Sequence, residues 1–398
     1  MAIKQVIVAG AGPVGMLCAF RLARAGIPVT VLERGTDLAE DLRASTWHPP
    51  TLDMMEELGL ADDIIRMGLI ARYVQYRDRR SGTVAEFDMD LLRGETGHPY
   101  RVQCEQFKFT RLVYERLSAF PHCRVLFGAR LTGFEQDADK VTVIMDRGNG
   151  SERLEADYLI GADGAWSTVR RVADIEFEGM TYPERFYVAT TAFEFADVLP
   201  RLSYVNYVAD TEEWFLLLKV PGSWRCLFPT RVDETDEEVV SDARTQARLQ
   251  GVHPRNEPYR TLHRTIYAVH QRVARKYRQG RVVLAGDAAH INNPLGGMGM
   301  NGGLHDAMSL CTALERIDRA EADESALDGY ERQRRPIAIE YINASTQRNK
   351  KVMEERDPEA RRRSQEEMCR QAEDSVRAKE FLKKSSMIDA LRAAGQLR

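Results

Sequence analysis

The fold is decided by the stretch Gly286-Asp287-Ala288-Ala289-His290-Ile291-Asn292-Asn293-Pro294-Leu295-Gly296-Gly297-Met298-Gly299-Met300-Asn301. The apolar run 282–285 before it predicts a buried strand, so the Asp287 carboxylate stands where it can bind hydroxyl groups of a dinucleotide. The glycines let backbone N–H groups approach a planar ring, and these amides lead into a helix start, which favours negative charge. A reduced flavin is anionic at its pyrimidine edge. We therefore interpret 286–301 as an isoalloxazine cradle.

A second glycine-rich element, Gly10-Ala11-Gly12-Pro13-Val14-Gly15, lies near the start of the chain. An apolar run precedes it, and a helix is predicted from Pro13, which is the strand–turn–helix context that dinucleotide binding requires. Gly10 allows the tight turn, Gly12 lets a pyrophosphate come close, and Gly15 lets the helix pack on the strand. Glu33 ends the next predicted strand near the ~20-residue spacing of a ribose-binding acid. A solvated strand-end charge is the alternative for Glu33.

A third element, Gly161-Ala162-Asp163-Gly164-Ala165-Trp166-Ser167-Thr168-Val169-Arg170, follows the predicted strand 156–160. Ser167 is expected to cap the helix that carries Arg170. Each element is a weak signal alone, but three in this order make a strong one. Together they resemble the single-component FAD-dependent aromatic hydroxylases, which share the para-hydroxybenzoate hydroxylase fold. The resemblance covers roughly the first three quarters of the chain.

The resemblance implies an α/β protein with a Rossmann-like FAD-binding domain, an interleaved β-sheet substrate domain and C-terminal helices. We assign 1–70, 104–180 and 271–320 to the FAD-binding domain and 321–398 to the C-terminal helices. The substrate-binding sheet takes 71–103 and 181–270, because this part is rich in β-like runs and aromatic residues. Segment 125–145 is predicted to form a small β-meander.

The resemblance also implies cofactor contacts along the three elements and between them. Arg43 is expected over the flavin and its ribityl chain, Gln106 beside the pyrophosphate or ribityl region, and Arg34 beside a 2′-phosphate of NADPH. The expected cofactor-binding residues are Gly10, Gly12, Pro13, Val14, Gly15, Glu33, Arg34, Arg43, Gln106, Asp163, Gly164, Gly286, Asp287, Pro294, Gly297, Gly299, Met300 and Asn301. A surface position is the alternative for Arg34, Arg43 and Gln106, and a purely structural turn is the alternative for Asp163.

The expected reaction is hydroxylation of a small activated aromatic ring, such as a phenol, hydroxybenzoate or hydroxypyridine. NADH or NADPH binds transiently and reduces the flavin, and O2 then gives a flavin-(4a)-hydroperoxide that attacks the ring. The Pro294 carbonyl is expected to face the site of the oxygen reaction. Position alone makes Arg43, His48, Tyr204, Tyr207 and Arg225 candidates for the catalytic pocket, although a core or surface position is the more ordinary interpretation for the last four. His290 is interpreted as a structural hydrogen-bond partner rather than a catalyst.

Three other readings compete with this one. The chain could be an epoxidase or a double-bond reductase on the same fold, and halogenase motifs are not evident. It could be a non-catalytic flavin redox sensor, which the intact loop from Pro294 to Asn301 argues against. A plain NAD-dependent dehydrogenase would leave the Asp163 and Asp287 elements unexplained.

The composition excludes several other classes of protein. A net charge of −4 implies no general attraction to nucleic acid or membrane, and no apolar run approaches a membrane span. The six scattered cysteines argue against a metal site or a disulfide framework, and no leader is recognised, so we expect a cytoplasmic protein. A homodimer is expected from base rates only. The charged segment after Asp357, with Arg361, Arg362 and Arg363, is predicted to be a solvated surface helix.

Overall fold

The computed structural model describes residues 2–40, 42, 44–148 and 150–395. Its core is a six-stranded sheet in the order β18-β19-β12-β1-β2-β8, in which all neighbours are parallel except the β18–β19 pair. The strands are β1 (Val6–Ala9), β2 (Val29–Leu32), β8 (Cys123–Leu126), β12 (Tyr158–Gly161), β18 (Arg278–Gln279) and β19 (Val282–Leu284). The β1, β2 and β12 strands are buried throughout, as apolar runs of a parallel sheet should be.

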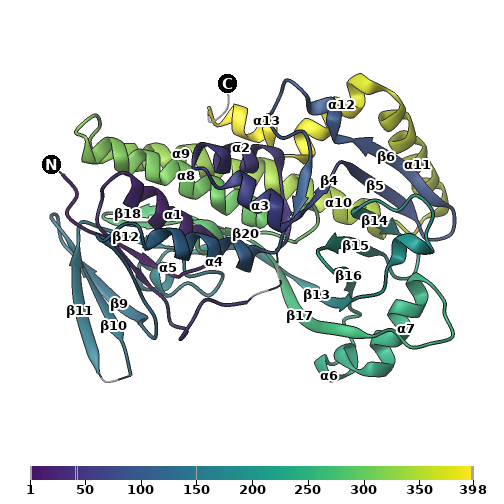
Figure 1. Cartoon of the computed structure of the whole chain (residues 1–398), viewed down its shortest axis with the longest axis horizontal. Coiled ribbons are helices and arrows are strands. Elements are labelled where there is room, and N and C mark those ends of the chain that lie inside the picture. The colour runs from purple at the N-terminus through teal and green to yellow at the C-terminus, as the bar shows by residue number, and fades with distance from the viewer. Residues whose placement is uncertain (1, 41, 43, 149, 396–398) are drawn as a thin grey trace.

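Helices cover this sheet and connect its strands (Figure 1). Helix α1 packs on both α4 and α8, and α8 packs on α9. The helices of this part are α1 (Pro13–Arg24), α2 (Pro49–Glu57), α3 (Ala61–Met67), α4 (Gln106–Leu117), α5 (Thr168–Val172) and α8 (Met298–Asp318). A separate three-stranded meander projects from the sheet and consists of β9 (Arg130–Gln136), β10 (Val141–Asp146) and β11 (Ser151–Ala156).

The meander differs from the prediction in its first strand. Residues 125–127 were expected to begin it, but β8 instead pairs in parallel with β2 at the edge of the FAD-domain sheet. The third meander strand is β11, which pairs with β10. A short apolar strand gives no local signal for its partner, so spacing along the chain was misleading here.

The second domain is built on an eight-stranded sheet in the order β20-β17-β13-β16-β15-β14-β5-β6. Its strands are β5 (Tyr73–Asp78), β6 (Gly82–Asp88), β13 (Phe177–Thr191), β14 (Val205–Ala209), β15 (Phe215–Val220), β16 (Ser223–Pro229), β17 (Thr261–Ala274) and β20 (His290–Ile291). The long strands β13 and β17 pair with each other and reach from this sheet back to the FAD domain, where β20 adds to β17. A small three-stranded sheet has the order β3 (Thr46–Trp47), β7 (Arg101–Gln103) and β4 (Leu69–Ala71).

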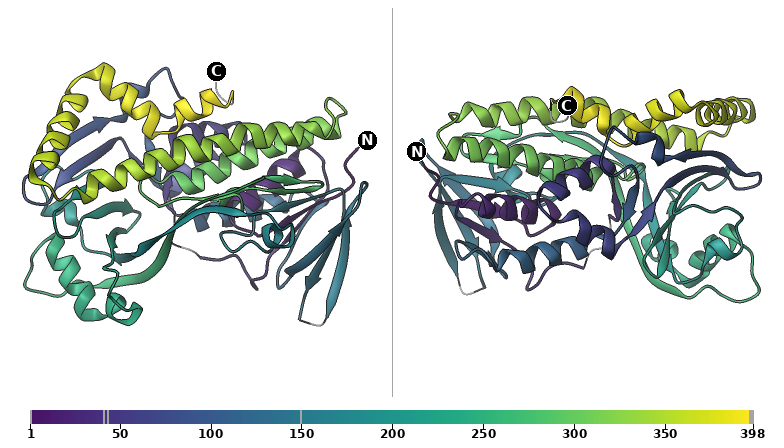
Figure 2. Two further views of the ribbon diagram at one scale, coloured as in Figure 1. Left: turned by 180° about the vertical axis from the view of Figure 1, so that it is seen from behind. Right: turned by 45° about the horizontal axis from the view of Figure 1, so that its top comes forward.

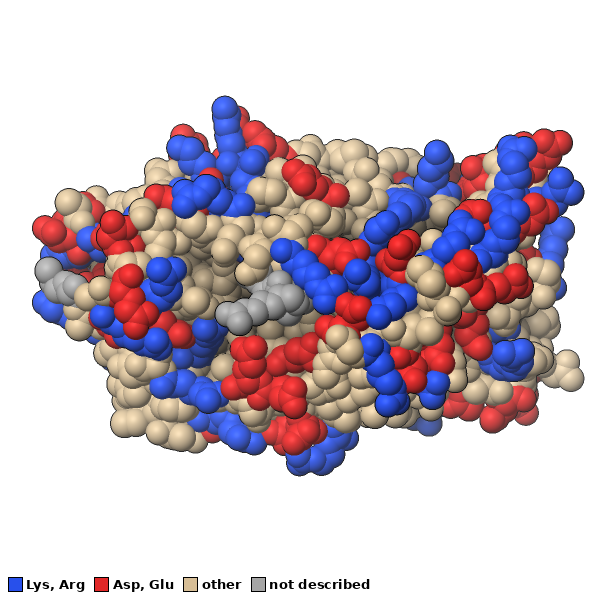
Figure 3. All heavy atoms as spheres, turned by 90° about the horizontal axis from the view of Figure 1, so that it is seen from above, with Lys and Arg blue, Asp and Glu red and all other residues tan. Residues whose placement is uncertain are grey.

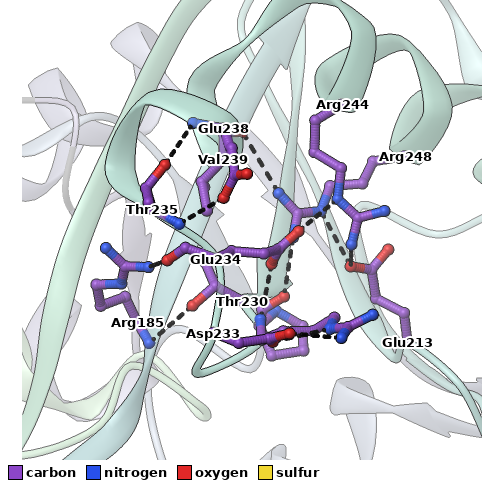
Figure 4. Close-up of polar contacts among 12 residues, drawn as sticks. Arg185, Glu213, Thr230, Asp233, Glu234, Thr235, Glu238, Val239, Arg244 and Arg248 are labelled. Carbon is purple, nitrogen blue, oxygen red and sulfur yellow. Dashed lines mark hydrogen bonds and ion pairs between the residues drawn. The ribbon is translucent and has the colours of Figure 1, made fainter.

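Two helices that the sequence reading did not anticipate, α6 (Asp236–Val240) and α7 (Asp242–Val252), cover the outer face of the second sheet. Figure 4 shows the ion-pair network that holds them. The fully buried Arg248 guanidinium contacts Glu213 at 3.0 Å and Glu234 at 3.2 Å, and Arg244 contacts Glu234 at 2.7 Å. Thr235 starts α6 with a capping box, which fixes the backbone directly after Glu234.

The C-terminal helices begin with one continuous helical run that spans both domains (Figure 2). It consists of α9 (Ser325–Ile337), a π-helical turn η4 (Ala338–Asn343) and α10 (Ala344–Glu354). Three further helices follow, namely α11 (Pro358–Glu373), α12 (Ser375–Ser385) and α13 (Ile388–Ala393). No helix among the described residues is long and apolar enough to cross a membrane.

The prediction that Arg361, Arg362 and Arg363 are all solvated on a surface helix is wrong for one of them. Arg361 is largely buried because it pairs with Asp78 on β5, whereas Arg362 and Arg363 are exposed as expected. Gln365 also donates to Asp78, at 3.1 Å, so α11 is fastened to the edge of the second sheet. Over the remaining surface, acidic and basic side chains are interspersed on the face seen in Figure 3.

Candidate active site

A cavity of about 610 Å³ lies where the three glycine-containing elements meet the second sheet. Its FAD-domain side includes ten of the predicted cofactor-binding residues: Gly12, Pro13, Val14, Gln106, Gly164, Asp287, Pro294, Gly297, Gly299 and Met300. The opposite side is an apolar roof formed by Val188, Leu216, Leu218, Leu227, Tyr267 and Val269. Elements up to about 290 residues apart in the chain are thus joined into one site.

The first glycine turn leaves room for a bound group. A side chain at Gly15 would lie 2.0 Å from the Gly10 carbonyl oxygen, and Gly10 itself has φ +100°, so both glycines are required by the turn. Gly12 is different, because a Cβ there would meet no protein atom within 4 Å although the residue lines the cavity. The space beside Gly12 therefore fits the pyrophosphate of FAD.

Two helices start at this cavity without a side-chain cap. Gly12 is the N-cap of α1 and Gly297 is the N-cap of α8, and neither helix has an acidic residue in its first turn. Their first N–H groups and their helix dipoles favour an anion at each start. Two negatively charged parts of FAD, the pyrophosphate and the reduced flavin ring, match these two positions.

Glu33 is held in place by the same turn. Its carboxylate accepts hydrogen bonds from the Ala11 N–H at 2.9 Å and the Gly35 N–H at 2.8 Å. Arg34 is exposed and does not line the cavity. The predicted ribose and 2′-phosphate contacts of these two residues remain predictions.

Asp163 serves its own helix rather than the cavity. Its carboxylate accepts from the Ser167 hydroxyl and from the Thr168 N–H at 2.7 Å, while Ser167 caps α5 as predicted by accepting from the Arg170 N–H at 2.9 Å. The Asp163 side chain thus stabilises the turn before α5, and its predicted contact with the cofactor stays a prediction. Arg170 links two of the elements, since it donates to the Ala165 and Ala288 carbonyls, each at 2.8 Å.

The loop before α8 is a tight turn with two left-handed glycines, Gly296 at φ +120° and Gly297 at φ +67°. The Gly297 N–H donates to the Pro294 carbonyl at 3.0 Å. This carbonyl was expected to face the oxygen-reaction site, but one of its lone pairs is used inside the turn. Pro294 itself lines the cavity, and the predicted direction of its carbonyl stays a prediction.

Asn301 and His48 contact this loop and are not among the residues that line the cavity, so their predicted roles at the cofactor and the substrate stay predictions. The Asn301 side chain accepts from the His48 N–H at 2.9 Å and donates to the Gly297 carbonyl at 2.6 Å and the Thr46 carbonyl at 2.8 Å. It also accepts from the Thr51 hydroxyl at 2.7 Å, so its capacity is filled by protein groups. The contacts span some 250 residues, which is why the sequence could not show them.

His48 contacts the loop of residues 291–300, which we call the flavin loop, as a neutral imidazole. It is completely buried, and its Nε2 lies 2.9 Å from the Gly296 carbonyl oxygen, to which it donates. Burial first, and then the positive charge of Arg101, hold the pKa of His48 well below its usual range. His48 thus fixes the loop from below and is unsuited to be a base for the substrate.

We expect Asn301→Ala to weaken FAD retention and to destabilise the protein by about 2–3 kcal/mol, because several buried partners lose their hydrogen bonds. Thermal unfolding and FAD content measure the two effects. Asn206→Ala is the matched control, since Asn206 is equally buried and bonds the Ser203 and Leu217 carbonyls far from the loop. The control should lose stability but keep FAD, and equal loss of FAD in both variants would contradict the assignment.

A buried ion-pair network behind the cavity was missed from the sequence. His290 Nε2 lies 2.7 Å from Asp306, and Arg334 Nε lies 2.7 Å from the other oxygen of the same carboxylate. Asp306 also accepts from the Gly286 N–H at 3.1 Å. The structural role predicted for His290 is confirmed. An acid among the mostly small and apolar residues 302–311 was the available signal for Asp306.

Of the remaining candidates for the catalytic pocket, one lines the cavity and two do not. Arg225 is buried, lines the cavity and donates to the Ser45 hydroxyl at 3.1 Å. Tyr204 is 38% exposed, and Tyr207 stacks on Tyr76 with ring centroids 5.0 Å apart. Neither is among the residues that line the cavity, so their roles in the pocket stay predictions. Tyr207 pairs with Leu216 and lies on the same face of the sheet as the roof, but β14 is the next strand outward, where Tyr207 packs in the core with Tyr76. Arg43 lies outside the described residues.

Comparisons with known proteins agree with this geometry. A family model described as "FAD binding domain" matches residues 4–345. Para-nitrophenol 4-monooxygenase from Pseudomonas sp. (strain WBC-3) is 34% identical over 360 residues, covering 89% of each chain. The 6-hydroxy-3-succinoylpyridine 3-monooxygenase of Pseudomonas putida (strain DSM 28022 / S16) is 32% identical and covers 86% of this chain and 87% of its own length.

A solved structure shares the whole architecture. The crystal structure of p-nitrophenol 4-monooxygenase from Pseudomonas putida DLL-E4 superposes with a TM-score of 0.92 at 32% identity, covering 97% of this chain and 99% of that one. The similarity therefore extends over both domains and the C-terminal helices of this chain. With the family model and these relatives, the chain belongs to the FAD-dependent aromatic hydroxylases, which are flavoprotein monooxygenases.

Proposed function

We propose that the protein hydroxylates a small, anionic, monocyclic aromatic compound with NADH or NADPH and O2 as co-substrates. The observation that carries this proposal is the composition of the cavity, in which the buried Arg225 is set into an apolar roof opposite the flavin-binding elements. When bound, FAD supplies the redox chemistry, accepting a hydride and activating O2. The protein supplies position, charge and dryness.

The roof gives the ring its place and excludes water. Leu216, Leu227 and Val269 are buried and line the cavity, so they offer an apolar surface to one face of an aromatic ring. Water exclusion protects the activated oxygen from unproductive loss. A cavity of about 610 Å³ must also hold the flavin ring, which favours a single substrate ring.

Arg225 gives the polar end of the substrate its place. A guanidinium in an apolar wall favours the anionic form of a phenol, carboxylate or related group, and the phenolate form is the more nucleophilic one. The relatives named for nitrophenol and for a hydroxypyridine act on rings that carry a hydroxyl group, which is consistent with this class.

We infer that the nicotinamide nucleotide binds transiently at the mouth of the cavity. Trp166 lines the mouth and is 77% exposed, and its ring lies 5.9 Å from that of His270 in an edge-on arrangement. An exposed indole at a cofactor cavity is suited to stacking on a planar ring. Both NADH and NADPH are compatible with this surface.

We expect Arg225→Met to weaken binding of 4-nitrophenolate about 10- to 100-fold, because one hydrogen bond to a charged group contributes about 1.5–3 kcal/mol. Perturbation of the flavin absorption spectrum reports ligand binding without turnover. Arg264→Met is the control, since Arg264 lies on the same sheet but bonds the Val240 carbonyl. Equal weakening for 4-nitrophenolate and for uncharged nitrobenzene would argue against the charge contact.

The test of the proposed function is oxidation of NADH and NADPH by the FAD-loaded protein with hydroxylated benzoates, nitrophenols and hydroxypyridines. Product mass is read from the same reactions. The proposal expects that a phenolic anion accelerates oxidation and gains one oxygen atom. Ligands that perturb the flavin spectrum and accelerate oxidation, yet never gain oxygen, would make the protein a reductase or a sensor instead.

A further inference from the structure

One buried glutamine connects the substrate roof to the flavin loop. Tyr267, Val269 and Gln271 stand at alternate positions of β17, so they share one face of the strand. The first two line the cavity, whereas Gln271 lies just past its edge and is only 4% exposed. The same strand face therefore carries both the roof and Gln271.

The acceptor side of Gln271 holds the start of the flavin loop. Its Oε1 accepts from the Asn293 backbone N–H at 3.4 Å, from the Asn293 side-chain amide at 3.3 Å and from the Tyr182 hydroxyl at 3.5 Å. Asn293 is completely buried, and its own Oδ1 accepts from the Leu295 N–H at 3.1 Å. The residues on both sides of Pro294 are thereby fixed to β17.

The donor side of Gln271 reaches the π-helical turn η4. Its Nε2 donates to the Asn343 side-chain oxygen and, at 3.3 Å, to the Thr346 hydroxyl. Asn343 is the last residue of η4, and π-helical turns inside longer helices are frequently found at functional sites. Six residues further along, Asn349 donates to the Leu295 carbonyl at 3.2 Å, so the helical run binds the loop a second time.

We propose that Gln271 is a positioning residue that transmits occupancy of the substrate roof to the flavin loop, with η4 as its fixed support. A ring under Tyr267 and Val269 presses on the strand face that holds Asn293, and the next residue, Pro294, lines the cavity. The loop is therefore set correctly for reaction when the roof is filled. This inference rests on the proposed function for the part that concerns substrate.

The test compares variants of the full-length, FAD-loaded protein. Gln271→Leu removes the hydrogen bonds to both Asn293 and Asn343, and Asn343→Leu removes only the bond to η4. Gln271→Glu still accepts from Asn293, and Asn343 can rotate its side-chain amide to donate to the new carboxylate. Gln75→Leu is the matched control, because Gln75 is a completely buried glutamine on β5 of the same sheet, far from the loop. Amide hydrogen exchange of 291–300 is measured, together with NADH oxidation with and without 4-nitrophenol.

Gln271→Leu and Asn343→Leu should speed exchange in 291–300 by about ten-fold, as expected when one buried anchor is lost. Stimulation by 4-nitrophenol should fall about ten-fold through kcat, with KM and the unstimulated rate within about three-fold. Gln271→Glu should restore exchange to within about three-fold of the wild type, and Gln75→Leu should change neither quantity. Wild-type exchange in Gln271→Leu, or the same loss in Gln75→Leu, would overturn the proposal.

The two proposals can fail separately. If no aromatic compound stimulates the wild-type protein, the proposed function fails, while the exchange of 291–300 still decides whether Gln271 holds the loop. If stimulation is normal in Gln271→Leu, the proposed function stands and the role of Gln271 is wrong.

Discussion

Gly12→Leu should leave the fold intact and raise the Kd for FAD by about 100-fold or more, since blocking the pyrophosphate site removes about 3 kcal/mol of binding free energy. The backbone at Gly12 has φ −70°, which any residue can adopt, and a Cβ there meets no protein atom within 4 Å. The leucine side chain would therefore fill the space beside the α1 start without disturbing the strand or the helix. Titration of the apoprotein with FAD, read by flavin fluorescence, measures the effect.

Gly251→Leu is the control for Gly12→Leu. Gly251 is an exposed residue of α7, where the nearest atom to an added Cβ is 3.7 Å away in Arg79. This variant should bind FAD normally, and circular dichroism should give wild-type secondary structure for both proteins. FAD binding by Gly12→Leu within about three-fold of the wild type would mean that the pyrophosphate lies elsewhere.

Asp306→Ala is expected to destabilise the protein by about 3–5 kcal/mol, because it leaves the buried Arg334 guanidinium and His290 imidazole without their carboxylate. All three side chains are almost completely buried. Asp328→Ala, which breaks the more exposed pair with Arg278, is the control and should cost less than about 1 kcal/mol. Urea denaturation at pH 7 measures both changes, and similar losses in the two variants would contradict the network's role.

The difference in the free energy of unfolding between wild type and Asp306→Ala should depend on pH, and the pKa of Asp306 gives its direction. Burial acts to raise the pKa of Asp306, but His290 and Arg334 outweigh it and hold the pKa at about 2. This is below the value of about 3.9 for an unfolded chain, so the stabilisation is present above about pH 4 and is lost as the pH falls through about 2. The difference in the free energy of unfolding between wild type and Asp306→Ala should therefore become smaller as the pH falls from about 4 to about 2.

The parts of the site that depend on local backbone geometry could be predicted from the sequence. Gly10 and Gly15 are required by the turn they form, and Gly12 and Gly297 open helices at the cavity, all within a few residues of the chain. The fold class followed from the same local patterns. The N-cap of α5 at Ser167 was likewise predictable from the local sequence.

The parts that depend on contacts between distant segments could not be predicted. Asn301 belongs to the predicted loop, but its partners Thr46 and His48 are about 250 residues away, and they engage both the oxygen and the nitrogen of its side-chain amide. Tyr207 lies on the same face of the second sheet as the roof residue Leu216, but on β14, the strand beyond β15, and one sequence does not reveal this strand order. Asp306 and Arg334 meet only because α9 folds back on α8.

The division of the roof between strands has a consequence for how substrate range can change. Val188, Leu216, Leu218 and Leu227 come from β13, β15 and β16, whose other face packs under α6 and α7 rather than against the flavin elements. Swapping these four for other apolar residues reshapes the space for the ring while leaving FAD undisturbed. Residues 267–271 both line the substrate roof and hold the flavin loop. A substitution there that changes substrate selectivity is therefore expected to disturb the position of the flavin loop as well. Laboratory evolution toward new ring compounds should therefore accumulate changes on β13, β15 and β16 and leave β17 nearly untouched.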